Sequence, residues 1–244
     1  LAAPPPAGAP PVAVVGEPIL ARWQRGGAKR ISREAPVPVV EVDGERPEES
    51  PGGAANTAVN LAALGARVRL VTAIGDDADG RRLRELVAQA GVDTSGFVVR
   101  AGSATPSKTR ILAGDQIIVR VDHGVREHLS PADRAVLHGR VREHDPQSVP
   151  GGWGYGTGLG DAAALEVLAA LPRPRTLVVD AHDLRPWAAL RPDIVTPNSV
   201  ETELLLDRAL PEHGRPESVG AAAHEVLAAA GAAAAVVTTD TGGT

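Results

Sequence analysis

The chain has 244 residues, of which 43% are hydrophobic and 23% charged, so it is long enough to bury the core of a large α/β domain. Its net charge of −5 and its aromatic content of 2% argue against a nucleic-acid-binding protein, which needs basic surfaces and stacking side chains. The sequence contains no cysteine, and no apolar stretch reaches the roughly 18 residues that a spanning helix needs, which argues against disulfide-framework and membrane classes.

The N-terminal part begins with residues 1–11, which are almost all alanine and proline and are predicted to form a flexible tail. Residues 12–15 form a β-branched run that predicts a strand ending at Gly16 and Glu17. The run 36–42 contains two prolines, which suit an edge strand.

A helix is predicted to open at the Pro51–Asn56 segment and to stop at Gly65. Its apolar face is expected to contain Ala58, Leu61, Ala62 and Leu64. A strand over 68–74 and a helix over 81–89 follow. This alternation of strands and helices predicts parallel βαβ units.

The middle of the chain has a different pattern. Residues 109–112 and 116–121 read as two short strands, and Gly114-Asp115 between them is a good hairpin turn. With the run 36–42 these strands are expected to form a small sheet outside the main one.

The C-terminal half returns to helices and strands. Helices are predicted over 131–143, 162–171 and 219–230, and strands over 176–180, 194–196 and 234–238. Residues 146–158 lie where another central strand is due, but two prolines and five glycines predict that they do not form one. The fold class is therefore α/β: a doubly wound, mostly parallel sheet flanked by helices, with a small β appendage.

Two motifs suggest ligand binding. Gly52 and Gly53 allow close approach of the backbone to a ligand, and the side chain of Asn56 suits sugar hydroxyls, although a glycine pair before a helix is often structural. Asn198 and Glu201 follow a buried strand and would lie one helical turn apart. They suit phosphate or magnesium-bound water, or equally a helix N-terminus with an acid in its first turn.

Other patterns are weaker. The acids of Gly75–Gly80 lack the remaining ligands of an EF-hand, so Asp76, Asp77 and Asp79 are interpreted as helix-capping residues. The glycines of 151–160 lack the Gly-Lys-Ser/Thr of a Walker A loop. Asp180 and His182, at the end of a strand, remain candidate functional residues.

Together these residues resemble the ribokinase-like (PfkB) carbohydrate kinases. Gly52-Gly53-Ala54-Ala55-Asn56, the later Gly65 and Gly75, and Asn198-Ser-Val-Glu201 are similar to the motifs of that family. Within that family the sequence most resembles the D-glycero-D-manno-heptose-7-phosphate kinases of ADP-heptose biosynthesis. The segments 16–23, 30–39 and 108–122 carry this closer resemblance.

The resemblance implies a cytoplasmic enzyme that uses ATP and Mg²⁺ to phosphorylate a sugar phosphate, for this branch a heptose 7-phosphate at C1. Residues 12–244 would form the kinase domain, with lid strands near 36–42 and 107–122. The lid often serves as the clasp of a homodimer in this family.

The resemblance also assigns roles to individual residues. Those expected to contact the sugar or its phosphate are Glu17, Gly52, Gly53, Asn56, Lys108, Arg110 and Asp180. Those expected to bind the nucleotide are Asn198, Glu201, Thr238 and Gly243, and Glu201 would also serve the metal.

The departures from the family are equally specific. The Gly-Ala-Gly-Asp motif that carries the catalytic Asp is expected beyond Thr244, so no catalytic residue is assigned and these 244 residues alone are predicted to be inactive. Ala21 stands where a sugar-binding Asp is expected, and His182 where a Lys is expected. We therefore keep two alternatives: a non-catalytic homologue that binds a sugar phosphate or nucleotide, and a PfkB kinase for another sugar or nucleoside.

Overall fold

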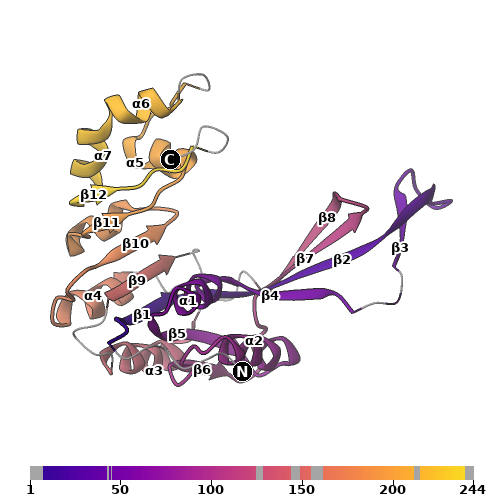
Figure 1. Ribbon diagram of the computed structural model, residues 1–244, viewed down its shortest axis with the longest axis horizontal. Coiled ribbons are helices and arrows are strands. Elements are labelled where there is room, and N and C mark those ends of the chain that lie inside the picture. The colour runs from indigo at the N-terminus through magenta and orange to yellow at the C-terminus, as the bar shows by residue number, and fades with distance from the viewer. Residues whose placement is uncertain are drawn as a thin grey trace.

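The computed structural model describes residues 8–42, 44, 46–124, 129–143, 149–154, 162–211 and 215–239. Its main sheet has seven parallel strands in the order β12-β11-β10-β9-β1-β5-β6 (Figure 1). In chain order these strands are β1 (Pro11–Gly16), β5 (Arg67–Gly75), β6 (Phe97–Arg100), β9 (Val149–Gly154), β10 (Val178–Ala181), β11 (Ile194–Val195) and β12 (Ala234–Ala235). The predicted doubly wound parallel sheet is confirmed.

Helices cover both faces of the sheet because its central strands alternate their apolar side chains. Val14 and Leu70 pack with α1 (Ala54–Ala63) and α2 (Ala78–Gln89), whereas Val15 and Val71 pack with α3 (Pro131–Arg142) and α4 (Ala162–Ala170). All four strand side chains are buried. Burial on both faces explains why these strands read as continuous apolar runs.

The C-terminal strands have a core of their own. The β10 and β11 side chains pack with Trp187 of η1 (Arg185–Leu190), Leu205 of α5 (Ser199–Leu206) and Val226 of α7 (Ala223–Ala230). The helix α6 (Arg215–Ala221) precedes α7, so the helix predicted over 219–230 is divided at Ala222.

A second sheet projects from the main body (Figure 1). Its strands are β2 (Pro18–Ile31), β3 (Pro38–Val42), β4 (Glu48–Gly53), β7 (Ser107–Ala113) and β8 (Gln116–His123). The order is β3-β2-β7-β8, and β4 also pairs with β2. The predicted β7–β8 hairpin and the edge position of β3 are confirmed, while β2 and β4 were not predicted.

Two sequence predictions are wrong. Leu64 does not lie on the buried face of α1: it is 84% exposed, because the helix ends at Ala63 and Leu64 is its C-cap. The segment expected not to be a strand contains β9, which lies between β1 and β10 and pairs with both. The predicted tail lies mostly outside the described residues, but Ala9 is buried and Pro11 begins β1.

The strand order reverses between β1 and β9. From β1 the chain proceeds to β5 and β6 on one side, and from β9 it proceeds to β10, β11 and β12 on the other. In open α/β sheets, ligands bind at such a point, in the crevice outside the carboxyl ends of the strands. The residues that follow Gly16 therefore lie where the fold predicts ligand binding.

Within the described part of the chain, no helix combines the length and apolar character needed to cross a bilayer.

Candidate functional site

The end of β1 is held close to the start of α1. The hydroxyl of Thr72 donates to the Gly16 carbonyl at 2.7 Å, and the amide of Ala54 donates to the Glu17 carbonyl at 2.9 Å. Glu17 itself is buried. These contacts fix the first turn of α1 beside the carboxyl end of β1.

Gly53 is required at this junction. Its φ of 58° lies in the left-handed region, and a Cβ placed there would meet the Glu17 carbonyl oxygen at 2.5 Å. Gly52 pairs with Ile19 in the β2–β4 ladder, and Asn56 is exposed in the first turn of the helix. The structure thus brings four of the predicted sugar-binding residues, Glu17, Gly52, Gly53 and Asn56, to one strand–helix junction.

The two predicted lid cations lie on β7, next to β2. In the parallel β2–β7 ladder, Ala21 is paired with Lys108 and Trp23 with Arg110. Ala21 is also paired with Ser50 of β4 and is buried. Lys108 therefore has a small apolar side chain across the ladder, where the family resemblance would place a carboxylate.

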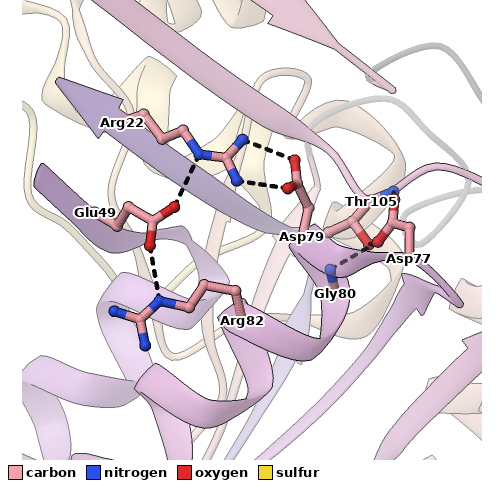
Figure 2. A network of polar contacts seen from close by, with 7 residues as sticks. All are labelled: Arg22, Glu49, Asp77, Asp79, Gly80, Arg82 and Thr105. Atoms are coloured by element: carbon pink, nitrogen blue, oxygen red, sulfur yellow. Dashed lines mark hydrogen bonds and ion pairs between the residues drawn. The ribbon is translucent and has the colours of Figure 1, made fainter. Parts of the chain in front are cut away.

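A network of ion pairs attaches this part of the second sheet to α2, and no sequence signal indicated it (Figure 2). Arg22 of β2 donates to Glu49 of β4 at 2.9 Å and to both carboxylate oxygens of Asp79 in α2. Glu49 in turn accepts from Nε of Arg82 at 2.7 Å. The two strands that lead to and from the junction of Glu17 with Gly53 are thereby fixed to a helix of the main domain.

The electrostatics of this network follow from its geometry. Burial raises the pKa of Glu49, but the hydrogen bonds from Arg82 and Arg22 outweigh that effect and leave the pKa below its ordinary value of 4.5. The hydrogen bond from Arg22 to Asp79 raises the pKa of the guanidinium further above its already high value. Glu49 is therefore ionised, and Arg22 protonated, at neutral pH.

Asp77 has a purely structural role in the described contacts. Its carboxylate accepts from the amide of Gly80 at 2.7 Å and from the amide and hydroxyl of Thr105 at 2.8 and 2.7 Å (Figure 2). Burial raises its pKa, and these hydrogen bonds more than compensate, so the pKa is lowered. Of the three acids interpreted as helix-capping residues, only Asp77 is the N-cap of α2. Asp79 pairs with Arg22, and Asp76 pairs with Arg81.

The predicted nucleotide-side residues meet at the N-terminus of α5. Asn198 Oδ1 accepts from the Glu201 amide, and Glu201 Oε2 accepts from the Asn198 amide, each at 2.9 Å. This capping box matches the helix-end interpretation of the motif. It also holds the Glu201 carboxylate in one orientation.

Two further candidate residues, His182 and Thr238, lie beside this helix end. His182 Nδ1 lies 2.6 Å from Glu201 Oε1, and Thr238 is bridged to Asn198, its amide donating to the Pro197 carbonyl at 3.1 Å. Asp180 is half-buried near the end of β10. Gly243 lies outside the described residues.

The side chains near the N-terminus of α5 could provide only some of the ligands of a magnesium ion. No group of three or more His, Asp or Glu side chains with metal-binding geometry occurs among the described residues. Mg²⁺ commonly takes one or two carboxylates and completes its shell with water and phosphate oxygens. The preorganised Glu201 carboxylate fits that more limited role.

The two groups of residues lie on the same edge of the main sheet. Glu17 follows β1 and Asn198 follows β11, and β9 and β10 lie between these strands. Three interstrand spacings separate them, which is about 14 Å. Such an edge can hold an elongated ligand, or two ligands that meet end to end.

Residues 27–244 match the family described as pfkB family carbohydrate kinase. The chain is 36% identical over 217 residues to the bifunctional protein HldE of Azorhizobium caulinodans, an alignment that covers 87% of this chain and 44% of that protein. The chain thus spans less than half the length of this curated relative.

Solved structures support the fold. Escherichia coli phosphofructokinase-2 in its tetrameric inhibited form has a TM-score of 0.70 at 19% identity, covering 95% of this chain and 74% of that one. The same enzyme in complex with fructose-6-phosphate has a TM-score of 0.69 at 21% identity, covering 93% and 73%. At these identities the likeness concerns the fold alone.

Proposed function

The chain belongs to the pfkB family of carbohydrate kinases, and from that premise we propose that it binds a heptose 7-phosphate and MgATP for phosphoryl transfer to C1 of the sugar. The observation that carries the proposal is the position of Lys108 and Arg110. Both lie on the strand that pairs with β2, and β2 starts directly after the Gly16-Glu17 end of β1. A cationic strand beside a sugar-side junction suits a sugar that already carries a phosphate.

Each group of residues then has a role in binding. Glu17, Gly52, Gly53 and Asn56 would orient the sugar hydroxyls, while Lys108 and Arg110 would neutralise its phosphate. Asn198 and Thr238 would border the nucleotide phosphates, and Glu201 would hold Mg²⁺ directly or through water. The metal would supply charge neutralisation on the phosphates, which is the main requirement of phosphoryl transfer besides positioning.

The base expected for the attacking hydroxyl is not found among these 244 residues. The Gly-Ala-Gly-Asp motif that the family resemblance assigns to it does not occur in the 244 residues. We therefore propose that these residues bind both ligands without turnover. The need for ATP also makes the cytoplasm the proposed location.

The test combines binding with turnover. Thermal unfolding is followed with D-glycero-D-manno-heptose 7-phosphate, fructose 6-phosphate, ribose or adenosine, each with and without MgATP, and ADP release is measured in parallel. We expect the largest stabilisation with the heptose phosphate, further stabilisation by MgATP, and no ADP. A preference for ribose or adenosine would contradict the substrate class, and sugar-dependent ADP release would contradict the absence of turnover.

Ala21 favours a second candidate, a non-catalytic sugar-phosphate-binding homologue. The buried methyl group across from Lys108 provides no acceptor for a sugar hydroxyl, and a charged hydrogen bond is worth about 1.5–3 kcal/mol. MgATP distinguishes the two candidates, because a protein that binds only the sugar phosphate should show no added stabilisation with the nucleotide.

We also propose that the second sheet mediates a homodimer. Ile117, Val119 and Val121 of β8 are all about half exposed, although side chains of this kind are normally buried. They form an apolar strip at the outer edge of the second sheet, where a second copy of the chain would cover them.

A further inference from the structure

The second sheet has two chemically different faces near its base. Arg22 and Glu49 point toward α2, because both form ion pairs with side chains of that helix (Figure 2). Successive residues of a strand point to opposite faces. Ala21 and Trp23, the neighbours of Arg22 in β2, therefore point to the face away from α2.

The strand register places a group of charged residues on that same face. Residues paired across a ladder share a face, and Lys108 is paired with Ala21 and Arg110 with Trp23. In the β7–β8 hairpin, Asp122 is paired with Lys108 and Arg120 with Arg110. We call this set the cationic face; its members are Trp23, Lys108, Arg110, Arg120 and Asp122.

Trp23 contacts the central cation of this face. The guanidinium carbon of Arg110 lies 5.2 Å from the centroid of the Trp23 ring, within the range of a cation–π interaction. A guanidinium that stacks on a ring keeps its edge available for N–H donation. Trp23 therefore limits the directions in which Arg110 can donate.

Two guanidiniums of this face oppose each other. Arg110 and Arg120 are directly paired, an arrangement that is unfavourable for like charges in a sheet. Asp122 accepts from Arg120 at 2.8 and 3.0 Å, and Glu48 of β4 is paired with Trp23. An added phosphate group would relieve the repulsion of the two guanidiniums.

We propose that Arg120 is a further specificity-determining residue for the phosphate of the sugar phosphate, and that Trp23 is a positioning residue that holds Arg110 for the same group. This inference rests on the proposed function. Six residues of β2, about 20 Å, separate Glu17 from Trp23. The arginine side chains of the cationic face would therefore have to reach back along the sheet, toward the junction, to meet the phosphate of the bound sugar.

The experiment is calorimetric titration of the 244-residue chain with D-glycero-D-manno-heptose 7-phosphate and with the unphosphorylated heptose. The variants are Arg120→Gln, Trp23→Leu and Trp23→Tyr, with Arg30→Gln as the matched control. Arg30 is an exposed arginine of β2 that donates to Glu41 at 3.1 Å, at the outer end of the strand.

We expect Arg120→Gln to weaken binding of the phosphorylated sugar about ten-fold or more and to leave the unphosphorylated sugar unchanged. Trp23→Leu should weaken it about three-fold or more, and Trp23→Tyr should restore most of the loss because the aromatic face returns. Arg30→Gln should bind both sugars as the wild type does. Thermal unfolding of each variant shows whether it is folded.

Failure of this inference and failure of the proposed function give different results. If the wild type binds the sugar phosphate and Arg120→Gln and Trp23→Leu bind it equally well, the inference is overturned and the proposed function stands. If the wild type binds neither sugar, the proposed function fails. Inorganic phosphate then serves as the probe, compared with chloride of equal ionic strength. A phosphate-dependent change in tryptophan fluorescence that Trp23→Leu removes supports the anion site if Arg120→Gln also abolishes it, and any other result overturns the site.

Discussion

Arg22 of β2 and Asp79 of α2 lie 57 residues apart in the sequence and form a two-point ion pair, with one guanidinium nitrogen 2.8 Å from Asp79 Oδ2. Both side chains are largely buried, at 21% and 24% exposure. Glu49 joins Arg22 to Arg82, so the network connects two strands of the second sheet to one helix of the main domain. The base of the second sheet is thereby held in place relative to the junction of Glu17 with Gly53.

Removing Arg22 should therefore destabilise the fold. We expect Arg22→Gln to lower the free energy of unfolding by about 1–3 kcal/mol, because two partly buried carboxylates lose their shared partner. Arg30→Gln breaks a pair whose side chains are about 60% exposed and should cost less than about 1 kcal/mol. Denaturant unfolding measures both, and equal losses would contradict the structural role of Arg22.

Stability should fall in acid through Glu49 and Asp77. The pKa of each is lower in the folded protein than its ordinary value, which is 4.5 for Glu49 and 3.8 for Asp77. Between the unfolded and folded pKa values the unfolded chain holds more protons, so stability increases with pH there. The contribution is complete above the ordinary pKa values and is lost as the pH falls through the lower folded ones.

Urea unfolding at a series of pH values checks this. Glu49→Gln should flatten the fall in stability below pH 5. Glu48→Gln removes a carboxylate from the adjacent residue of β4, on the other face of the strand, and serves as its control. An identical pH dependence in the Glu49→Gln variant and the wild type would show that the Glu49 network does not contribute.

Gly53 should tolerate no side chain. Gly53→Ala combines a left-handed backbone with a close contact to the Glu17 carbonyl, so we expect a loss of about 1–3 kcal/mol and weaker sugar binding. Gly139 lies in the interior of α3 with no atom near a built Cβ, and Gly139→Ala should stabilise the protein by about 0.5–1 kcal/mol. Opposite signs are the expected result. A neutral Gly53→Ala variant would mean that the junction can rearrange.

Lysine in the apolar strip of β8 should prevent dimerisation. Val119→Lys and Val121→Lys place charges in the proposed interface, and each should lower the dimer fraction at least ten-fold in sedimentation experiments. Val99→Lys changes an equally exposed valine on β6 of the main sheet and should leave the fraction unchanged. A monomeric wild type, or dimers that withstand both substitutions in β8, would exclude this interface.

The sequence was sufficient for the elements whose pattern is local. The β-branched runs of β1 and β5, the hairpin at Gly114-Asp115 and the capped start of α2 were all predicted. In each, propensity, turn chemistry and capping favour the same structure. The start of the helix after Gly52-Gly53 was also predicted, because glycines allow the backbone conformations that such a junction requires.

The missed elements depend on distant parts of the chain. Gly151 and Gly152 of β9 have poor strand propensity, yet β1 and β10 pair with β9 on both sides, and tertiary pairing overrides propensity. The polar strand β2 shows no clean alternation, and it is held by three neighbouring strands. The Arg22–Asp79 pair cannot be predicted from local sequence, since only the fold brings the two residues together.

The proposed function requires that this chain binds a sugar that already carries a phosphate. The most direct test is the ratio of its dissociation constants for D-glycero-D-manno-heptose and for D-glycero-D-manno-heptose 7-phosphate, measured by calorimetry at low salt. We expect saturable one-to-one binding of the heptose phosphate, about ten-fold or more tighter than that of the free heptose. Equal affinity for the two sugars, or no binding of either, would contradict it.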